Sequence, residues 1–242
     1  MILRRMADAL RRQEWLTVFI ESALIILGVL IALQVDNWNE ARQSQRGAIG
    51  ALQRLHDEVT ANIAAIDDRL DVMENTRDVR TQAFAVIGAC DPTPEASETV
   101  IAAAWSLTGD IIPSFVDSAA QGLSRRDQFL DLMSNDFRNA LNMYSGRLLD
   151  ERAQLETNFG LMWETHVVGH SALGIFLDDG TMESPDLTLE VPLTDVCEDT
   201  DFRRRLSMTE IWHQSTALRL ERFKGHSQDF LAIIDQQKEA LQ

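Results

Sequence analysis

The sequence predicts an all-α protein in which a single N-terminal transmembrane helix continues into an elongated, exported helical bundle with one irregular segment near residues 174–199. The first observation behind this prediction is the apolar run over residues 15–35. About twenty residues, each rising about 1.5 Å, span the roughly 30 Å hydrocarbon core of a bilayer. The second is a recurrence of apolar residues every three, four or seven positions, which is typical of helices with one buried face. We therefore divide the chain into residues 1–14, 15–35 and 36–242.

Residues 1–14 set the expected orientation of the transmembrane helix. They carry more basic than acidic side chains, namely Arg4, Arg5, Arg11 and Arg12 against Asp8 and Glu14. Because an arginine excess keeps the adjoining end in the cytoplasm, we expect a short cytoplasmic segment and an exported domain. A cleaved signal peptide is the alternative, but the run is long, contains Glu21 and lacks a small-x-small cleavage site at its end. So short a segment cannot build a core, so we expect no cytoplasmic catalytic domain.

Glu21, Gly28 and Ala32 share one face of the predicted transmembrane helix. Gly28 and Ala32 form a small-xxx-small pair that lets two helices approach closely, so we expect self-association at this face. Glu21 is an ionisable group inside the apolar run, and such charges are costly enough to indicate a function. Two interpretations of Glu21 stay open: an ion-coupled role, or a side chain that reaches the cytoplasmic boundary or pairs with an arginine.

Residues 40–88 are predicted to form one long helix after the transmembrane segment. Apolar residues at sevenfold spacing support it: Leu52, Val59, Ile66 and Met73. Arg77 and Arg80 interrupt this coiled-coil-like stripe, which therefore indicates one helix of a bundle. The string Asp91-Pro92-Thr93-Pro94 ends the helix, since proline disfavours helix before it and donates no backbone hydrogen bond.

The rest of the chain is predicted to form two short helices, a long helix, an irregular connection and a final long helix. The expected ranges are 97–107 and 115–123 for the short helices, and 124–172 and 201–241 for the long ones. Gly146 and Gly160 weaken the first of these long helices, and Gly146 is the expected place of a break. In the connection, Gly180, Pro185 and Pro192 indicate irregular structure, with one short strand over 187–191.

The chain is strongly acidic, with a formal net charge of −16. A field of that sign disfavours nucleic acid and anionic lipid surfaces, so we expect neither as a partner. Two cysteines, Cys90 and Cys197, lie in the exported part, where oxidising conditions permit one disulfide. A simple antiparallel bundle places Cys90 far from the membrane and Cys197 near it, whereas a disulfide needs their Cα atoms within about 7 Å. Both expectations hold together only if a long helix breaks.

Four histidines fall on or beside the apolar stripes of the predicted helices: His56, His166, His170 and His213. Counting along an antiparallel bundle places them at similar heights, so a metal site or a pH-sensitive layer is one hypothesis. The other is that they are ordinary buried histidines with hydrogen-bonded partners, because no carboxylate completes a metal motif. This counting assumes unbroken long helices, so the histidine layer and the disulfide are rival predictions.

Two parts of the sequence carry a resemblance to a known family. The N-terminal part comprises Glu21, Gly28 and the string Ile31-Ala32-Leu33-Gln34-Val35-Asp36-Asn37-Trp38-Asn39-Glu40. The middle part comprises Pro113-Ser114-Phe115 through Gly122, Asn135-Asp136-Phe137-Arg138-Asn139 and Tyr144. With these residues the chain resembles an uncharacterised bacterial family of single-pass membrane proteins, known only as a domain of unknown function. The resemblance implies a membrane location and a helical exported domain, and it carries over no activity or catalytic residue.

The sequence contains no motif for nucleophilic catalysis or phosphate binding, and we expect neither an enzyme nor a bound cofactor. The first functional hypothesis is a non-enzymatic, membrane-anchored periplasmic helical module that associates with itself or with other envelope proteins. The second is a metal-binding or pH-responsive domain that uses the bundle histidines. The third is an ion-coupled accessory subunit that uses Glu21. The expected partners are the lipid bilayer and a second copy of the chain or an envelope membrane protein.

Overall fold

The computed structural model describes residues 15–108, 112–176 and 186–242. Nearly all of its elements are helices, and the all-α prediction is confirmed. In chain order the elements are α2 (Trp15–Asn75), α3 (Arg77–Ala89), α4 (Pro94–Ser106), α5 (Ser118–Ser124), α6 (Asp127–Leu130), α7 (Asn135–Thr165), the short 3₁₀ turn η1 (Val167–Gly169), β1 (Leu173–Phe176), β2 (Asp186–Leu189), α8 (Leu193–Glu198) and α9 (Thr200–Ala240). The predictions for residues 1–14, Gly180 and Pro185 lie outside the described residues.

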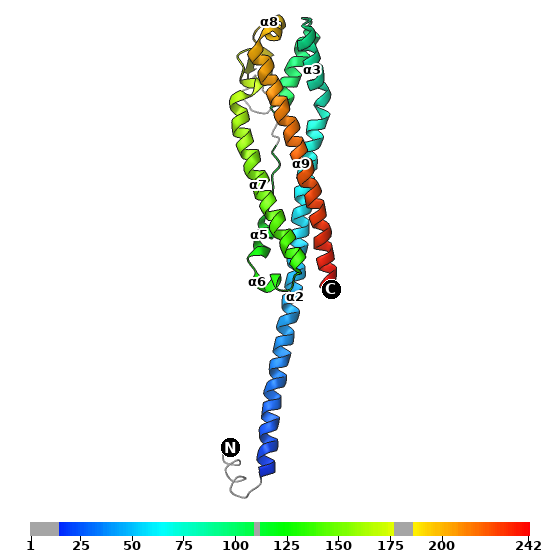
Figure 1. Cartoon of the computed structure of the whole chain (residues 1–242), viewed down its shortest axis with the longest axis vertical. Coiled ribbons are helices and arrows are strands. Elements are labelled where there is room, and N and C mark those ends of the chain that lie inside the picture. The colour runs from blue at the N-terminus through cyan, green and yellow to red at the C-terminus, as the bar shows by residue number, and fades with distance from the viewer. Residues whose placement is uncertain (1–14, 109–111, 177–185) are drawn as a thin grey trace.

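Helix α2 joins the predicted transmembrane segment and the predicted bundle helix in one unbroken element. Its N-terminal part stands clear of the rest of the described chain, and its part from Ala48 onward packs among the other helices (Figure 1). The sevenfold stripe is confirmed as the buried face: Leu52, Val59, Ile66 and Met73 are each at most 5% exposed. Gly47 lets α6 approach closely, because a Cβ there would lie 2.8 Å from the Phe129 ring.

Thr76 separates α2 from α3, so the helix predicted over 40–88 is divided near its end. The Thr76 hydroxyl donates to the carbonyl of Val72, at 3.0 Å, one turn back in α2. Helix α4 then begins as the prolines predict: the Thr93 hydroxyl accepts a hydrogen bond from the backbone N–H of Ala96, and Pro94 occupies the first turn. Helices α3 and α4 pack as a hairpin at the end of the bundle far from the N-terminus (Figure 1).

The chain returns from this far end to the base of the bundle through a segment without regular structure at residues 112–117. Two polar side chains of α2 hold the segment in place. The Asn62 amide accepts from the backbone N–H of Val116 and donates to its carbonyl, both at 2.8 Å. The Glu58 carboxylate accepts from the backbone N–H groups of Ala119 and Ala120, at 2.6 and 3.0 Å. An extended chain advances about 3.3 Å per residue, whereas a helix advances about 1.5 Å per residue. The extended segment therefore covers the way back to the base of the bundle with few residues.

This return places α7 parallel to α2 rather than antiparallel to it. Helix α7 rises from the base to the far end, and α9 descends to finish beside α2 (Figure 1). The simple antiparallel arrangement predicted from the sequence is therefore wrong. The predicted break at Gly146 is also wrong, since α7 is one helix from Asn135 to Thr165. The start predicted at residue 124 lies too early, because α6 and a turn precede α7.

The buried side chains form two main clusters. The basal core lies between α2, α5, α6, α7 and α9 and contains a stack of rings in which Tyr144 lies 6.0 Å from Phe223 and 4.8 Å from Phe230, centroid to centroid. The distal core lies between α3, α4, η1, α8, the β strands and the start of α9. Strands β1 and β2 pair antiparallel with Leu173 opposite Leu189, so a hairpin stands where the sequence predicted one strand.

Candidate functional site

The N-terminal part of α2 is a helix that could cross a membrane, by its length and its composition. The apolar window near its N-terminus is entirely uncovered by the rest of the described chain. Large apolar side chains point outward around the whole helix, among them Phe19, Leu24, Leu27, Leu30 and Ile31, which are each more than half exposed. A helix that is apolar on every side is typical of a membrane span rather than of a surface helix.

The structure keeps the predicted association residues on one continuous helical face. Glu21, Gly28 and Ala32 follow each other at seven and four positions within α2, so they lie nearly in line along it. A Cβ placed on Gly28 would meet no described atom within 4 Å, and Ala32 is exposed. This small-residue face is therefore open for a second helix.

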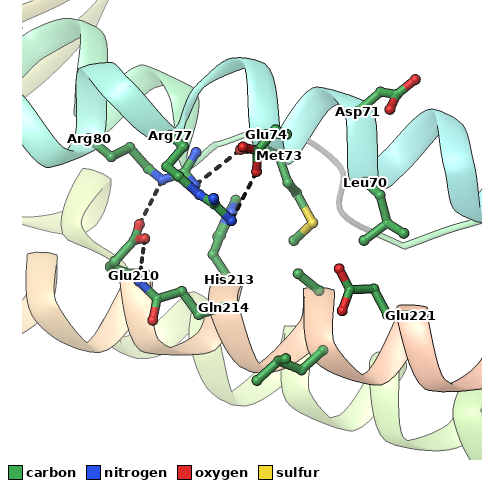
Figure 2. Close-up of a pocket in the computed structure, with 12 residues that line it drawn as sticks. Leu70, Asp71, Met73, Glu74, Arg77, Arg80, Glu210, His213, Gln214 and Glu221 are labelled. Atoms are coloured by element: carbon green, nitrogen blue, oxygen red, sulfur yellow. Dashed lines mark hydrogen bonds and ion pairs between the residues drawn. The ribbon is translucent and has the colours of Figure 1, made fainter.

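A buried ion pair between α3 and α9 occupies the region between the two cores. The Arg80 Nε lies 2.7 Å from Glu210 Oε2, and the two side chains are 5% and 12% exposed. Arg80 also donates to the carbonyl of Met73 at 3.2 Å and to the Thr76 hydroxyl. The guanidinium thereby bonds the backbone where α2 gives way to α3, and Figure 2 shows its contacts with Glu210 and Met73. Removing either partner would leave the other charge buried and unpaired.

His213 lies one turn after Glu210 on α9 and lines a cleft of about 520 Å³ between α9 and the α2–α3 junction (Figure 2). The imidazole is 2% exposed, and the backbone acceptor beside it is the Leu107 carbonyl. Burial, and secondarily the Arg80 charge, lower the pKa of His213 to about 4. His213 is therefore neutral at pH 7.

His166 lies beside His213, and both face the carbonyl of Leu107 at the end of α4. The His166 Nδ1 accepts from the backbone N–H of Val168 at 3.1 Å, and its Nε2 lies 2.9 Å from the Leu107 carbonyl, to which it donates. The Leu107 carbonyl raises the pKa of His213 slightly and the His166 charge lowers it, which indicates their closeness. Burial lowers the pKa of His166 as well, so this pair resists protonation.

His170 and His56 lie elsewhere. The His170 Nε2 is 3.3 Å from the Asp199 carboxylate and its ring packs edge-on against Phe202. His56 lies on α2 in the basal half, where its Nε2 is 3.8 Å from Asp235 on α9. The four histidines therefore do not share one layer, because α7 runs parallel to α2 and carries His166 and His170 to the far end. Among the described residues no group of three or more His, Cys, Asp or Glu side chains is arranged to hold a metal ion.

The two cysteines meet at the far end of the bundle. Cys90 caps the C-terminus of α3 and is half-buried, and Cys197 lies on α8 with its side chain in the distal core. Burial, and secondarily the nearby Cys90 thiol, raise the pKa of Cys197 to about 11. Both are free thiols in this structure. The sequence predicted that an antiparallel bundle would keep Cys90 and Cys197 apart. Because α7 runs parallel to α2, both cysteines lie at the far end and this conflict does not arise.

Sequence reasoning missed the Arg80–Glu210 pair. Its signal was present, because Arg80 stands seven residues after Met73, at the next position of the buried stripe, and Ile87 continues that stripe. A charge at a core position of a heptad pattern indicates a buried partner. The partner itself had no signal, since Glu210 comes from a helix 130 residues away along the chain.

Comparisons of the chain with protein-family models, with curated proteins and with solved structures returned no match.

Proposed function

We propose that this chain is a non-enzymatic helical module of the bacterial inner membrane that is anchored by α2, holds its bundle in the periplasm and pairs with a second copy through the anchor. The observation that carries the proposal is the exposed apolar surface around the N-terminal part of α2. Contact of such a surface with water is unfavourable and contact with lipid is not, which supports a membrane span at this part of the helix.

The small-residue face supports pairing of two copies. Without a hydrophobic driving force between helices in lipid, close backbone approach decides which faces associate, and Gly28 and Ala32 permit such approach. Because α2 continues unbroken from this face into the basal core, the pairing of two anchors would also fix how the two bundles stand relative to each other. The anchor would then act as an assembly surface as well as a tether.

A matched pair of variants tests this proposal. The double change Gly28→Leu with Ala32→Leu fills the small-residue face, whereas Ala23→Leu adds the same side chain on the opposite side of α2, at about 100° per residue. We expect the double variant to lose energy transfer between labelled copies in lipid vesicles and the control to retain it. Equal transfer in both variants would contradict pairing at this face. Recovery of a different membrane protein in place of a second copy would support an envelope partner instead.

A pH-responsive bundle is a second candidate function. It is favoured by the burial of His166 and His213 next to each other and beside the Arg80–Glu210 pair, since a proton added there must enter an apolar surrounding. The metal-binding version has no comparable support among the described residues. The ion-coupled role of Glu21 stays a hypothesis that rests on its place in the apolar run.

A further inference from the structure

Cys90 and Cys197 are more than one hundred positions apart in the sequence, yet both side chains belong to the distal core or pack against it. Cys90 ends α3 and Cys197 lies on α8, and these two helices pack against each other. The fold therefore brings the two cysteines into one neighbourhood, which is the first requirement of a disulfide.

The backbone at Cys90 points to a role for its side chain. Cys90 has φ 51° and ψ 48°, in the left-handed region, and is the residue other than glycine with positive φ in the described chain. Its backbone N–H donates to the carbonyl of Val86 at 2.8 Å, the bond expected where a helix ends in this conformation. Glycine is favoured at such an end because a Cβ is strained there. A cysteine at this position adds a thiol that glycine would not supply.

We infer that Cys90 and Cys197 form an intramolecular disulfide that fastens the end of α3 to α8. The inference rests on the periplasmic location of the proposed function, because that compartment supplies the oxidant, a protein disulfide donor. The reaction is thiol–disulfide exchange. One cysteine thiolate attacks the donor disulfide, giving a mixed disulfide and one donor thiol. The second cysteine then attacks the first, joins the two sulfur atoms and releases the second donor thiol, so both cysteines are oxidised and the donor is reduced.

Exposure sets the order of these two steps. Cys90 is half-buried and can reach a donor in solution, whereas Cys197 is 6% exposed and cannot. Cys90 is therefore the attacking residue and Cys197 the resolving one. Burial also raises the pKa of Cys197, which makes its thiol the poorer nucleophile of the two for an oxidant in solution.

The test uses the full-length chain in mild detergent, first reduced and then exposed to oxidised glutathione. We expect the intact mass to fall by two hydrogens, both cysteines to resist maleimide, and digestion to yield one peptide that joins Cys90 to Cys197. A matched control moves the thiol by one residue, with Cys90→Ser and Asp91→Cys together, and should stay reactive to maleimide. A chain that keeps two reactive thiols, holds glutathione on Cys90 alone or forms only dimers would overturn the inference.

A second measurement separates this inference from the proposed location. Alkylation of acid-quenched cells expressing the full-length chain reports the state of the two cysteines in the cell. Blocked cysteines there support both the disulfide and the periplasmic location. Free thiols in cells combined with a bond formed by glutathione in the purified chain would overturn the location and leave the disulfide geometry standing.

Discussion

The basal and distal halves of the bundle share α9, but different chemistry holds them together. In the basal half, rings and aliphatic side chains of α2, α7 and α9 interlock, and Tyr144 stacks on Phe223 and Phe230. In the distal half, Arg80 and His213 lie buried, together with the thiol of Cys197. Apolar packing does not change with pH or redox conditions, whereas a buried imidazole and a thiol can. The basal half also buries the Glu58 carboxylate, but the backbone N–H groups of Ala119 and Ala120 hold it. We therefore expect a change of pH or of redox conditions to act on the bundle first at the end far from the anchor.

The distal half carries buried polar side chains because its backbone is irregular. Where short elements meet, helix-end carbonyls have no partner in the next turn and need donors from side chains. Three carbonyls accept such hydrogen bonds: that of Met73 from Arg80, that of Leu107 from His166 and that of His166 from Arg205. Side chains also bond free carbonyls in the basal half, where Asn62 donates to that of Val116 and Arg152 to that of Phe115. The distal pair differs in that the buried Arg80 charge is tied to the turn between α2 and α3.

The largest expected effect comes from breaking the buried ion pair. Arg80→Met leaves the buried Glu210 carboxylate without its opposite charge, so we expect the free energy of unfolding to fall by about 3–5 kcal/mol. Arg77→Met is the matched control, because Arg77 is exposed and pairs with Glu74 at the surface, and it should cost no more than about 0.5 kcal/mol. Urea unfolding of the full chain in detergent, followed by circular dichroism, gives both values. Equal losses would contradict a buried pair.

Acidification should come next in size and should act on the distal half. His213 has an ordinary pKa of 6.5 in the unfolded chain and about 4 in the folded one. The unfolded chain therefore gains a proton first as the pH falls, and the free energy of unfolding drops between pH 6.5 and 4 by about 3 kcal/mol. The charged and titratable groups that act on His213 are Arg80 from α3, Glu210 from α9 and His166 before η1. The lowered pKa of His166 acts in the same direction.

A variant isolates this contribution of His213. His213→Gln keeps a polar side chain without a titratable nitrogen and should flatten the pH dependence of stability between pH 6.5 and 4. His226→Gln removes an exposed histidine of the same helix and should leave the slope unchanged. Unfolding midpoints at several pH values measure both slopes. A slope that persists in His213→Gln would assign the acid response to other groups.

The sequence predicts the basal half of the bundle better than the distal half. The basal half is built from long periodic helices, whereas the distal half depends on where short elements meet. The buried stripe of α2 and the inner face of α9 follow from periodicity, and Leu52, Val59, Phe223 and Phe230 lie where it predicts. Periodicity says nothing about the direction of a helix, so the extended return through residues 112–117 was unforeseen. That return alone decides that Cys197 reaches Cys90. The contacts that join the candidate site across elements, Arg80 with Glu210 and His166 with Leu107, are long-range, and a single sequence carries little information about them.

The smallest expected effect should occur in the basal half and should not depend on pH in the acidic range. Tyr144→Phe keeps the ring stack on Phe223 and Phe230 but removes the hydroxyl that accepts from the Asn62 amide at 2.9 Å. One buried amide hydrogen then lacks a partner, so we expect a loss of about 1 kcal/mol. The loss should be the same at pH 7.5 and pH 5, because burial raises the pKa of Tyr144 to about 12, well outside this range. A loss that grows at pH 5 would show that acid reaches the basal core and would remove the distinction between the two halves.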